Sequence, residues 1–215
     1  MIAKLLMLNL IMLGTAPASG DAELHGWQKY SGADDIRIHY RYSHGDTLEI
    51  QAETNVQSCA AAFLHLLEDT SQISNWASNT RNATILDQPA DNVHVVHTVF
   101  KTIWPISSRD MVTRSEWQFH SDSQTLHLNI ENASDALAPA HGVVRMTEVA
   151  ANWRLQQGEN GSLSITYQGY ANPEGRIPRT IARRTTLRAI QQTFRSLGSV
   201  LADYQEPYHH IPCGV

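Results

Sequence analysis

The chain is poor in cysteine and in charge, and both shortages narrow what it can be. Only two of its 215 residues are cysteine, too few for a disulfide-rich miniature fold or a four-cysteine zinc site. Charged residues make up 17%, and Asp and Glu outnumber Lys and Arg by 21 to 16. Proteins that bind nucleic acids generally present a basic surface to the phosphates, so we expect no nucleic-acid partner.

The short motifs of common active sites are also missing. The sequence contains no Gly-x-Ser-x-Gly elbow, no His-Glu-x-x-His and no phosphate-cradling glycine loop. We therefore expect neither an enzyme nor a metal or cofactor site. His94 and His97 are three apart on a predicted strand and should point to opposite faces. His209 and His210 with Cys213 could bind a metal, but we expect a mobile C-terminal tail over 209–215.

No apolar run reaches the roughly 20 residues that a membrane-spanning helix needs. The apolar run over 5–13 follows a short positive start at Lys4 and precedes a small-x-small pattern at Ala16 and Ala18. This arrangement is typical of a signal peptide. It predicts removal of residues 1–20 and export, to the periplasm of a Gram-negative bacterium or otherwise by secretion.

An exported chain meets an oxidising compartment, which bears on its two cysteines. A disulfide between Cys59 and Cys213 would close a very long loop. The alternative is a buried free Cys59 and a loose tail that carries Cys213. The sequence leaves both open, because it does not show whether the two Cα atoms approach within bonding range.

Hydrophobic periodicity divides the rest of the chain into strands and helices. Alternation predicts two strands, and a change of period then predicts a helix capped by Ser58. Apolar residues at three- and four-residue steps from Leu187 to Tyr204 predict a long final helix that begins near Pro178. The predicted strands cover 36–42, 47–54, 81–86, 93–103, 110–119, 125–130, 143–156 and 162–170, and a short second helix covers 72–76. Short connections favour an antiparallel sheet in an α+β fold, bent around the final helix, with room for an apolar cavity.

Three segments resemble the START family, the steroidogenic-acute-regulatory-related lipid-transfer domains. Residues 101–110 (KTIWPISSRD) resemble the family's corner between two strands, and residues 139–145 (PAHGVVR) resemble the end of its omega loop. Residues 172–178 (NPEGRIP) resemble the segment that leads into its final helix. The resemblance implies a START/helix-grip fold over 21–208, monomeric, whose internal tunnel holds one lipid such as a sterol or phospholipid. The gate would be the final helix and the loop over 131–142.

One departure from the family affects the expected ligand. Many sterol-binding relatives carry a buried acid–arginine pair in the tunnel. Aligned from Arg109 and Asp110, those positions fall near Val96 and Ser115, and neither is charged. The resemblance therefore leaves the lipid class open.

The alignment and strand alternation together give candidate lipid-binding residues. On the two central strands these residues would share an inward face, and Thr98, Thr113 and Ser115 could orient a lipid hydroxyl or headgroup. The alternative is that all of them fill a solid core. The candidates are Val96, Thr98, Phe100, Met111, Thr113, Ser115 and Trp117 on strands, and Ile181 and Phe194 on the final helix.

Arginine is concentrated near the final helix of this otherwise acidic chain. Such a basic face could make transient contact with anionic membrane lipids, or it could be an ordinary solvated surface. The residues are Arg176, Arg179, Arg183, Arg184, Arg188 and Arg195. Arg109 and Asp110 are expected to form a structural pair that pins the corner.

The alternative to binding and transfer of a lipid is an enzyme of the polyketide cyclase or aromatase type, which belongs to the wider helix-grip superfamily. Such an enzyme needs acid–base groups that converge on the cavity. His97, Arg114 and Tyr167 are the candidates nearby. Export argues against this function, and a third possibility is a partner-binding module with a filled core.

Overall fold

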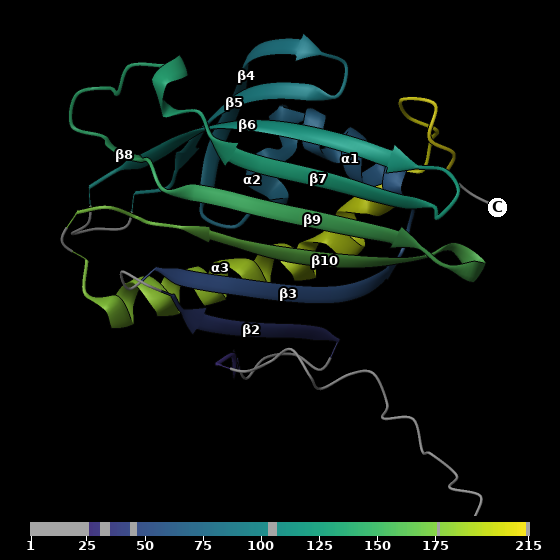
Figure 1. Cartoon of the computed structure of the whole chain (residues 1–215), viewed down its shortest axis with the longest axis horizontal. Helices are drawn as coiled ribbons and strands as arrows, with labels where there is room; N and C mark the ends of the chain where they lie inside the picture. Colours follow the sequence, from purple (N-terminus) through teal and green to yellow (C-terminus); the bar gives the residue numbers. More distant parts are fainter. Residues whose placement is uncertain (1–25, 31–34, 44–46, 103–106, 176, 214–215) are drawn as a thin grey trace, which may run out of the picture.

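In the described parts of the chain, ten strands form one curved sheet and three α-helices lie against one of its faces (Figure 1). The structure is a computed structural model and describes residues 26–30, 35–43, 47–102, 107–175 and 177–213. The strands are β1 (Gln28–Lys29), β2 (Ile36–Tyr42), β3 (Leu48–Gln57), β4 (Thr80–Ala90), β5 (Val93–Phe100), β6 (Arg109–His120), β7 (Thr125–Asn132), β8 (Val144–Met146), β9 (Val149–Gln157) and β10 (Ser162–Ala171). The helices are α1 (Ala60–Glu68), α2 (Ile73–Trp76) and α3 (Arg179–Val200).

The strand order is β1-β2-β3-β10-β9-β7-β6-β5-β4, and neighbours on this path are antiparallel. Hairpins join most neighbours, as short connections favour. Two features go beyond a simple meander. The last strand, β10, lies beside β3, and the short β8 pairs with β6 in parallel. The predicted strand over 143–156 is thus two strands that pair in different places.

The face of the sheet that meets the helices is called the inner face here. Alternate residues on β3, β10 and β9 bury their side chains on it. Phe63 of α1 and Phe194 of α3 both pack there against Trp153 of β9. Their ring centroids lie 5.2 and 5.7 Å, respectively, from that of Trp153. The main core therefore lies between these strands, α1 and the second half of α3.

The first helix is tied to the C-terminal tail. Cys59, not the predicted Ser58, caps α1: its Sγ accepts a hydrogen bond from the Ala62 amide at 3.3 Å. Cys59 also forms a disulfide with Cys213, which decides the alternative that the sequence left open. The hydroxyl of Tyr208 donates to Glu68 at 2.8 Å.

The prediction of a mobile tail over 209–215 is wrong for residues 209–213, because side-chain bonds and the disulfide hold them against α1. His209 Nε2 lies 3.0 Å from a Glu68 carboxylate oxygen. Across the described ranges, no group of three or more His, Cys, Asp or Glu side chains is arranged to hold a metal ion. The tail thus closes one end of the molecule.

The final helix follows its predicted apolar stripe. Leu187, Phe194 and Leu197 are buried, and the stripe continues to Leu201 in a short 3-10 turn, Leu201–Tyr204. Pro178 precedes the first helical residue, where a missing N–H does no harm. Figure 1 shows α3 crossing behind the sheet from one end of the molecule to the other.

Several expectations fall outside the described residues. These are the signal peptide over 1–20, the corner residues 103–106 and Arg176. Among the residues that are described, no helix combines the length and apolar character needed to cross a bilayer.

Candidate functional site

The seven predicted cavity residues on strands share the inner face. Antiparallel pairing places Thr98 of β5 opposite Met111 of β6. Further along β6, Trp117 lies opposite Leu128, a buried core residue of β7. Because facing residues in a sheet point to the same side, β5 and β6 present these side chains toward the helices, as the alternation predicted.

Six of these seven residues are set apart from the main core. Val96, Phe100 and Met111 are half-buried, and they neither belong to the core nor pack against it. Thr98 and Thr113 are buried, but their hydroxyls have no hydrogen-bond partner among the described residues. Ser115 is half-buried, and its hydroxyl makes a long contact of 3.4 Å with the His94 carbonyl. This set, called the β5–β6 wall below, presents an apolar surface with unpaired hydroxyls.

The other three candidates lie elsewhere. Trp117 packs against the core, and its ring is 5.0 Å from His209 of the tail. Phe194 is 2% exposed and stacks on Trp153. Ile181 is 46% exposed near the start of α3. The structure thus brings six candidates together on one wall, places two at the core and leaves one at the surface.

The three candidate acid–base groups do not converge. Arg114 lies on the outer face of the sheet and pairs with Glu116 and Glu131, at 2.7 and 3.5 Å. His97 also faces outward, toward Asp110. Tyr167 of β10 alone among the three faces inward, and burial raises its pKa to about 12. His94, as predicted, lies on the opposite face from His97 and approaches Glu68.

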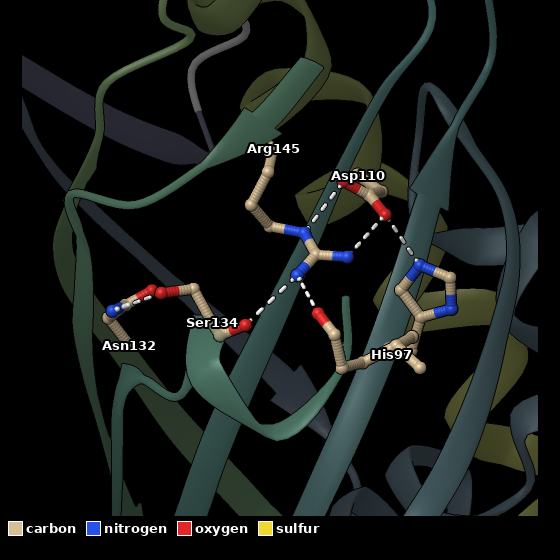
Figure 2. A network of polar contacts seen from close by, with 6 residues as sticks. His97, Asp110, Asn132, Ser134 and Arg145 are labelled. Atoms are coloured by element: carbon tan, nitrogen blue, oxygen red, sulfur yellow. Dashed lines mark hydrogen bonds and ion pairs between the residues drawn. The ribbon is translucent and has the colours of Figure 1, made fainter. Parts of the chain in front are cut away.

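An ion pair that the sequence did not identify lies under the loop before β8, residues 133–143 (Figure 2). Arg145 donates two hydrogen bonds to Asp110, at 2.8 and 2.9 Å, and their side chains are 6% and 2% exposed. Hydrogen bonds from Arg145 lower the pKa of Asp110 against the opposing effect of burial. His97 Nε2 lies 2.8 Å from the same carboxylate.

The remaining nitrogen of Arg145 reaches the loop itself. It donates to the backbone carbonyls of Ser134 and Leu137, at 3.1 and 2.6 Å (Figure 2). The Ala133 amide at the start of this loop also bonds the Val112 carbonyl of β6, which extends the pairing of β6 with β7. Arg145 therefore fixes the position of the segment that the resemblance assigned to the gate.

Arg109 and Asp110 do not pair with each other, which corrects the expected corner pair. Arg109 instead donates to the carbonyls of Pro173 and Glu174, at 2.7 and 3.0 Å, in the segment that leads into α3. Glu174 and Gly175 both have positive φ, 54° and 72°, which turns the chain at this point. Two adjacent residues of β6 thus tie together the three segments that resemble the START family.

The start of α3 is basic and rests on aromatic rings of β2. The guanidinium of Arg179 lies 4.9 Å from the ring of Tyr42, and that of Arg183 lies 5.6 Å from the ring of Tyr40. Both distances suit a cation–π contact. On the outer side of the helix, Ile181, Arg184 and Arg188 line a surface hollow with Thr180 and Thr185.

Comparisons with known proteins agree with this architecture. The START domain matches residues 18–200 of the chain. An uncharacterised protein of Pseudomonas aeruginosa is 20% identical over 197 residues, which cover 91% of this chain and 96% of the relative.

Two solved structures share the fold. The STAR-related lipid transfer protein from Xanthomonas axonopodis superposes with a TM-score of 0.74 at 24% identity, covering 82% of this chain and 99% of the other. Human STARD10 gives a TM-score of 0.73 at 17% identity, covering 86% and 76%. The chain has the START/helix-grip fold, with a curved antiparallel sheet and a long C-terminal helix. It belongs to the START domain family.

Proposed function

We propose that this protein binds a single hydrophobic lipid between the β5–β6 wall and α3 and carries it without covalent chemistry. The observation that supports this most directly is the wall itself. Val96, Phe100 and Met111 point inward yet make no contact with the packed core. Apolar side chains in that position leave a surface that a greasy ligand can cover.

Burial of the ligand would supply the binding energy. Covering roughly 300–400 Å² of acyl or ring surface at about 25 cal/mol/Å² is worth about 8–10 kcal/mol before the costs of binding. The hydroxyls of Thr98 and Thr113 can bond polar atoms of the lipid, since neither has a partner among the described residues. Their place on the wall favours a ligand that is largely apolar with few polar groups.

The gate in this proposal is the first half of α3 with the loop before β8. Exposed Ile181, Arg184 and Arg188 lie together there. An apolar side chain next to two cations suits transient contact with a membrane that contains anionic lipids. Such contact would loosen the helix and let the lipid enter or leave.

Two further observations support a carrier rather than a cyclase. The ionisable candidates face away from the interior: His97 contacts Asp110, and Arg114 forms an ion pair with Glu116. The similar protein from Xanthomonas axonopodis bears the name of a lipid transfer protein.

We also propose export to the periplasm, or secretion in a source without one. The N-terminal pattern over 1–20 supports it. The Cys59–Cys213 disulfide is consistent with folding in an oxidising compartment.

Mass spectrometry of an organic extract tests the binding proposal. The full chain is purified from its native compartment, and its extract is compared with that of a periplasmic protein of similar size. We expect one lipid class at close to one molecule per protein. Recovery of no enriched lipid, together with no uptake of a fluorescent phospholipid from vesicles, would contradict the proposal.

A further inference from the structure

One inward-facing polar group has no role in the fold. Tyr167 of β10 lies between Ala52 of β3 and Trp153 of β9 in the sheet. Its ring packs 4.8 Å from the Trp153 ring. Both of these neighbours are buried core residues, and Tyr167 is half-buried and packs against this core.

The hydroxyl of Tyr167 faces inward and is unpaired among the described residues. Burial raises the pKa of Tyr167 to about 12, so the phenol keeps its proton and remains a hydrogen-bond donor. Yet the side chain is only half-buried by surface area, and no described residue bonds its hydroxyl. A half-buried phenol without a partner among the described residues is a donor that a ligand on the inner face can use.

The lack of a side chain at Gly169 leaves room for the Tyr167 hydroxyl. Two residues further along β10 is Gly169, on the same face of the sheet. A Cβ atom at position 169 would lie 2.6 Å from the Tyr167 hydroxyl and 2.8 Å from the Ala150 carbonyl. Any other residue would therefore displace the phenol from its present position.

We propose that the Tyr167 hydroxyl donates a hydrogen bond to a neutral acceptor oxygen of the bound lipid, such as an ester or amide carbonyl. This inference rests on the proposed lipid-binding function. The neighbours of Tyr167 on the inner face are Ala52, Trp153, Ile165 and Gly169, which carry no charge. None of these sheet neighbours offers a counter-ion to an anionic headgroup, whereas a carbonyl needs only one donor.

Two pyrene probes of equal chain length test the inference in the full-length protein. Methyl 12-(1-pyrenyl)dodecanoate has a carbonyl acceptor, and 1-dodecylpyrene has none. For Tyr167→Phe we expect ester binding to weaken about fivefold to tenfold, the usual effect of one hydrogen bond, and hydrocarbon binding to stay unchanged. The matched control is Tyr170→Phe, since Tyr170 lies on the same strand and is 38% exposed on the other face.

The outcomes separate this inference from the function on which it rests. If the wild type binds both probes and Tyr167→Phe leaves their ratio unchanged, the inference is wrong and the proposed function stands. If the wild type binds neither probe, both fail. Without ligand, Tyr167→Phe should melt at the same temperature as the wild type or higher, because the hydroxyl has no partner to lose. A clear fall in melting temperature would assign the hydroxyl a structural role and overturn the inference.

Discussion

The two halves of α3 differ in how they meet the rest of the protein. The second half buries Leu187, Phe194 and Leu197 against the sheet and α1. Through the first half, from Arg179 to Thr186, no described side chain is fully buried. One helix thus combines an anchored end with an end that rests on the sheet through basic and half-buried side chains. Local stability follows buried apolar contact, so the first half should open at lower free energy than the second.

The same contrast extends to the segments beside each half. At the anchored end, the tail is joined to α1 by the Cys59–Cys213 disulfide and by bonds to Glu68. At the other end, Arg109 and Arg145 hold loop segments to β6 through backbone carbonyls. A ligand that enters this fold should therefore pass beside the first half of α3, and mutations at the two ends should have different effects.

The largest expected effect tests the anchored end. Replacing Cys59 and Cys213 together by serine removes a crosslink between residues 154 positions apart. The chain-entropy model predicts a loss of about 5 kcal/mol in the free energy of unfolding. Urea denaturation of the oxidised wild type and the double variant measures it. An unchanged midpoint would show that the tail does not stabilise this end.

The next prediction compares the two halves of the helix directly. Phe194→Ala should lower the free energy of unfolding by about 4 kcal/mol, because it leaves a cavity beside Trp153. Ile181→Ala, in the exposed first half, should change it by less than about 0.5 kcal/mol. Denaturant titration of both variants measures the difference. Similar losses in the two would contradict the contrast between the halves.

The ion pair under the loop gives a prediction with a pH dependence. Asp110→Asn leaves Arg145 buried without its counter-ion, which should cost about 3 kcal/mol at neutral pH. Glu116→Gln is the control, since its ion pair with Arg114 is exposed and should contribute little.

The sign of the pH dependence follows from the pKa shift of Asp110. Its folded-state pKa is lowered from 3.8, so its ionised form stabilises the protein above that value. This contribution is lost as the pH falls from about 4 toward the lowered pKa. The stability gap between the wild type and Asp110→Asn should therefore be constant near neutrality and narrow in acid. A gap that widens below about pH 4 would reverse the argument.

The smallest expected effects compare the two faces of β6 at the β5–β6 wall. Val112 and Thr113 are adjacent on β6 but point to opposite faces, and both are buried. Val112→Leu enlarges a packed site under the loop and should lower stability by about 1–2 kcal/mol. Thr113→Leu projects into the proposed ligand space, so stability should change less while uptake of a fluorescent phospholipid falls. Equal destabilisation by both variants would indicate that the wall faces a filled core.

Much of the fold could be predicted from the sequence, because periodicity reports which faces are buried. The strand predicted over 36–42 matches β2, and the stripe from Leu187 to Tyr204 matches the packed face of α3 and its last turn. Alternation also gave the common face of Thr98 and Met111. The capping residue of α1 was predicted wrongly, because Cys59 and not Ser58 caps the helix, and the disulfide of Cys59 with Cys213 is an alternative that the sequence left open.

The partners of charged groups could not be obtained in this way. Arg109 and Asp110 are neighbours in sequence, which suggested a pair between them. On β6 their side chains point to opposite faces, so one reaches the segment before α3 and the other reaches Arg145. The sequence offered Tyr167 only as a candidate acid–base group and gave no signal at Gly169, because an unpaired hydroxyl is recognised only when its surroundings are known.

The sequence by itself determined the elements, their buried faces and, through three short segments, the family. Those properties depend on local periodicity and turn chemistry, which a linear pattern records. Tertiary structure decided the place of β10 beside β3, the partner of Asp110, the disulfide and the unpaired hydroxyl on the inner face. These depend on which distant residues meet in space, and packing of the whole chain sets those distances.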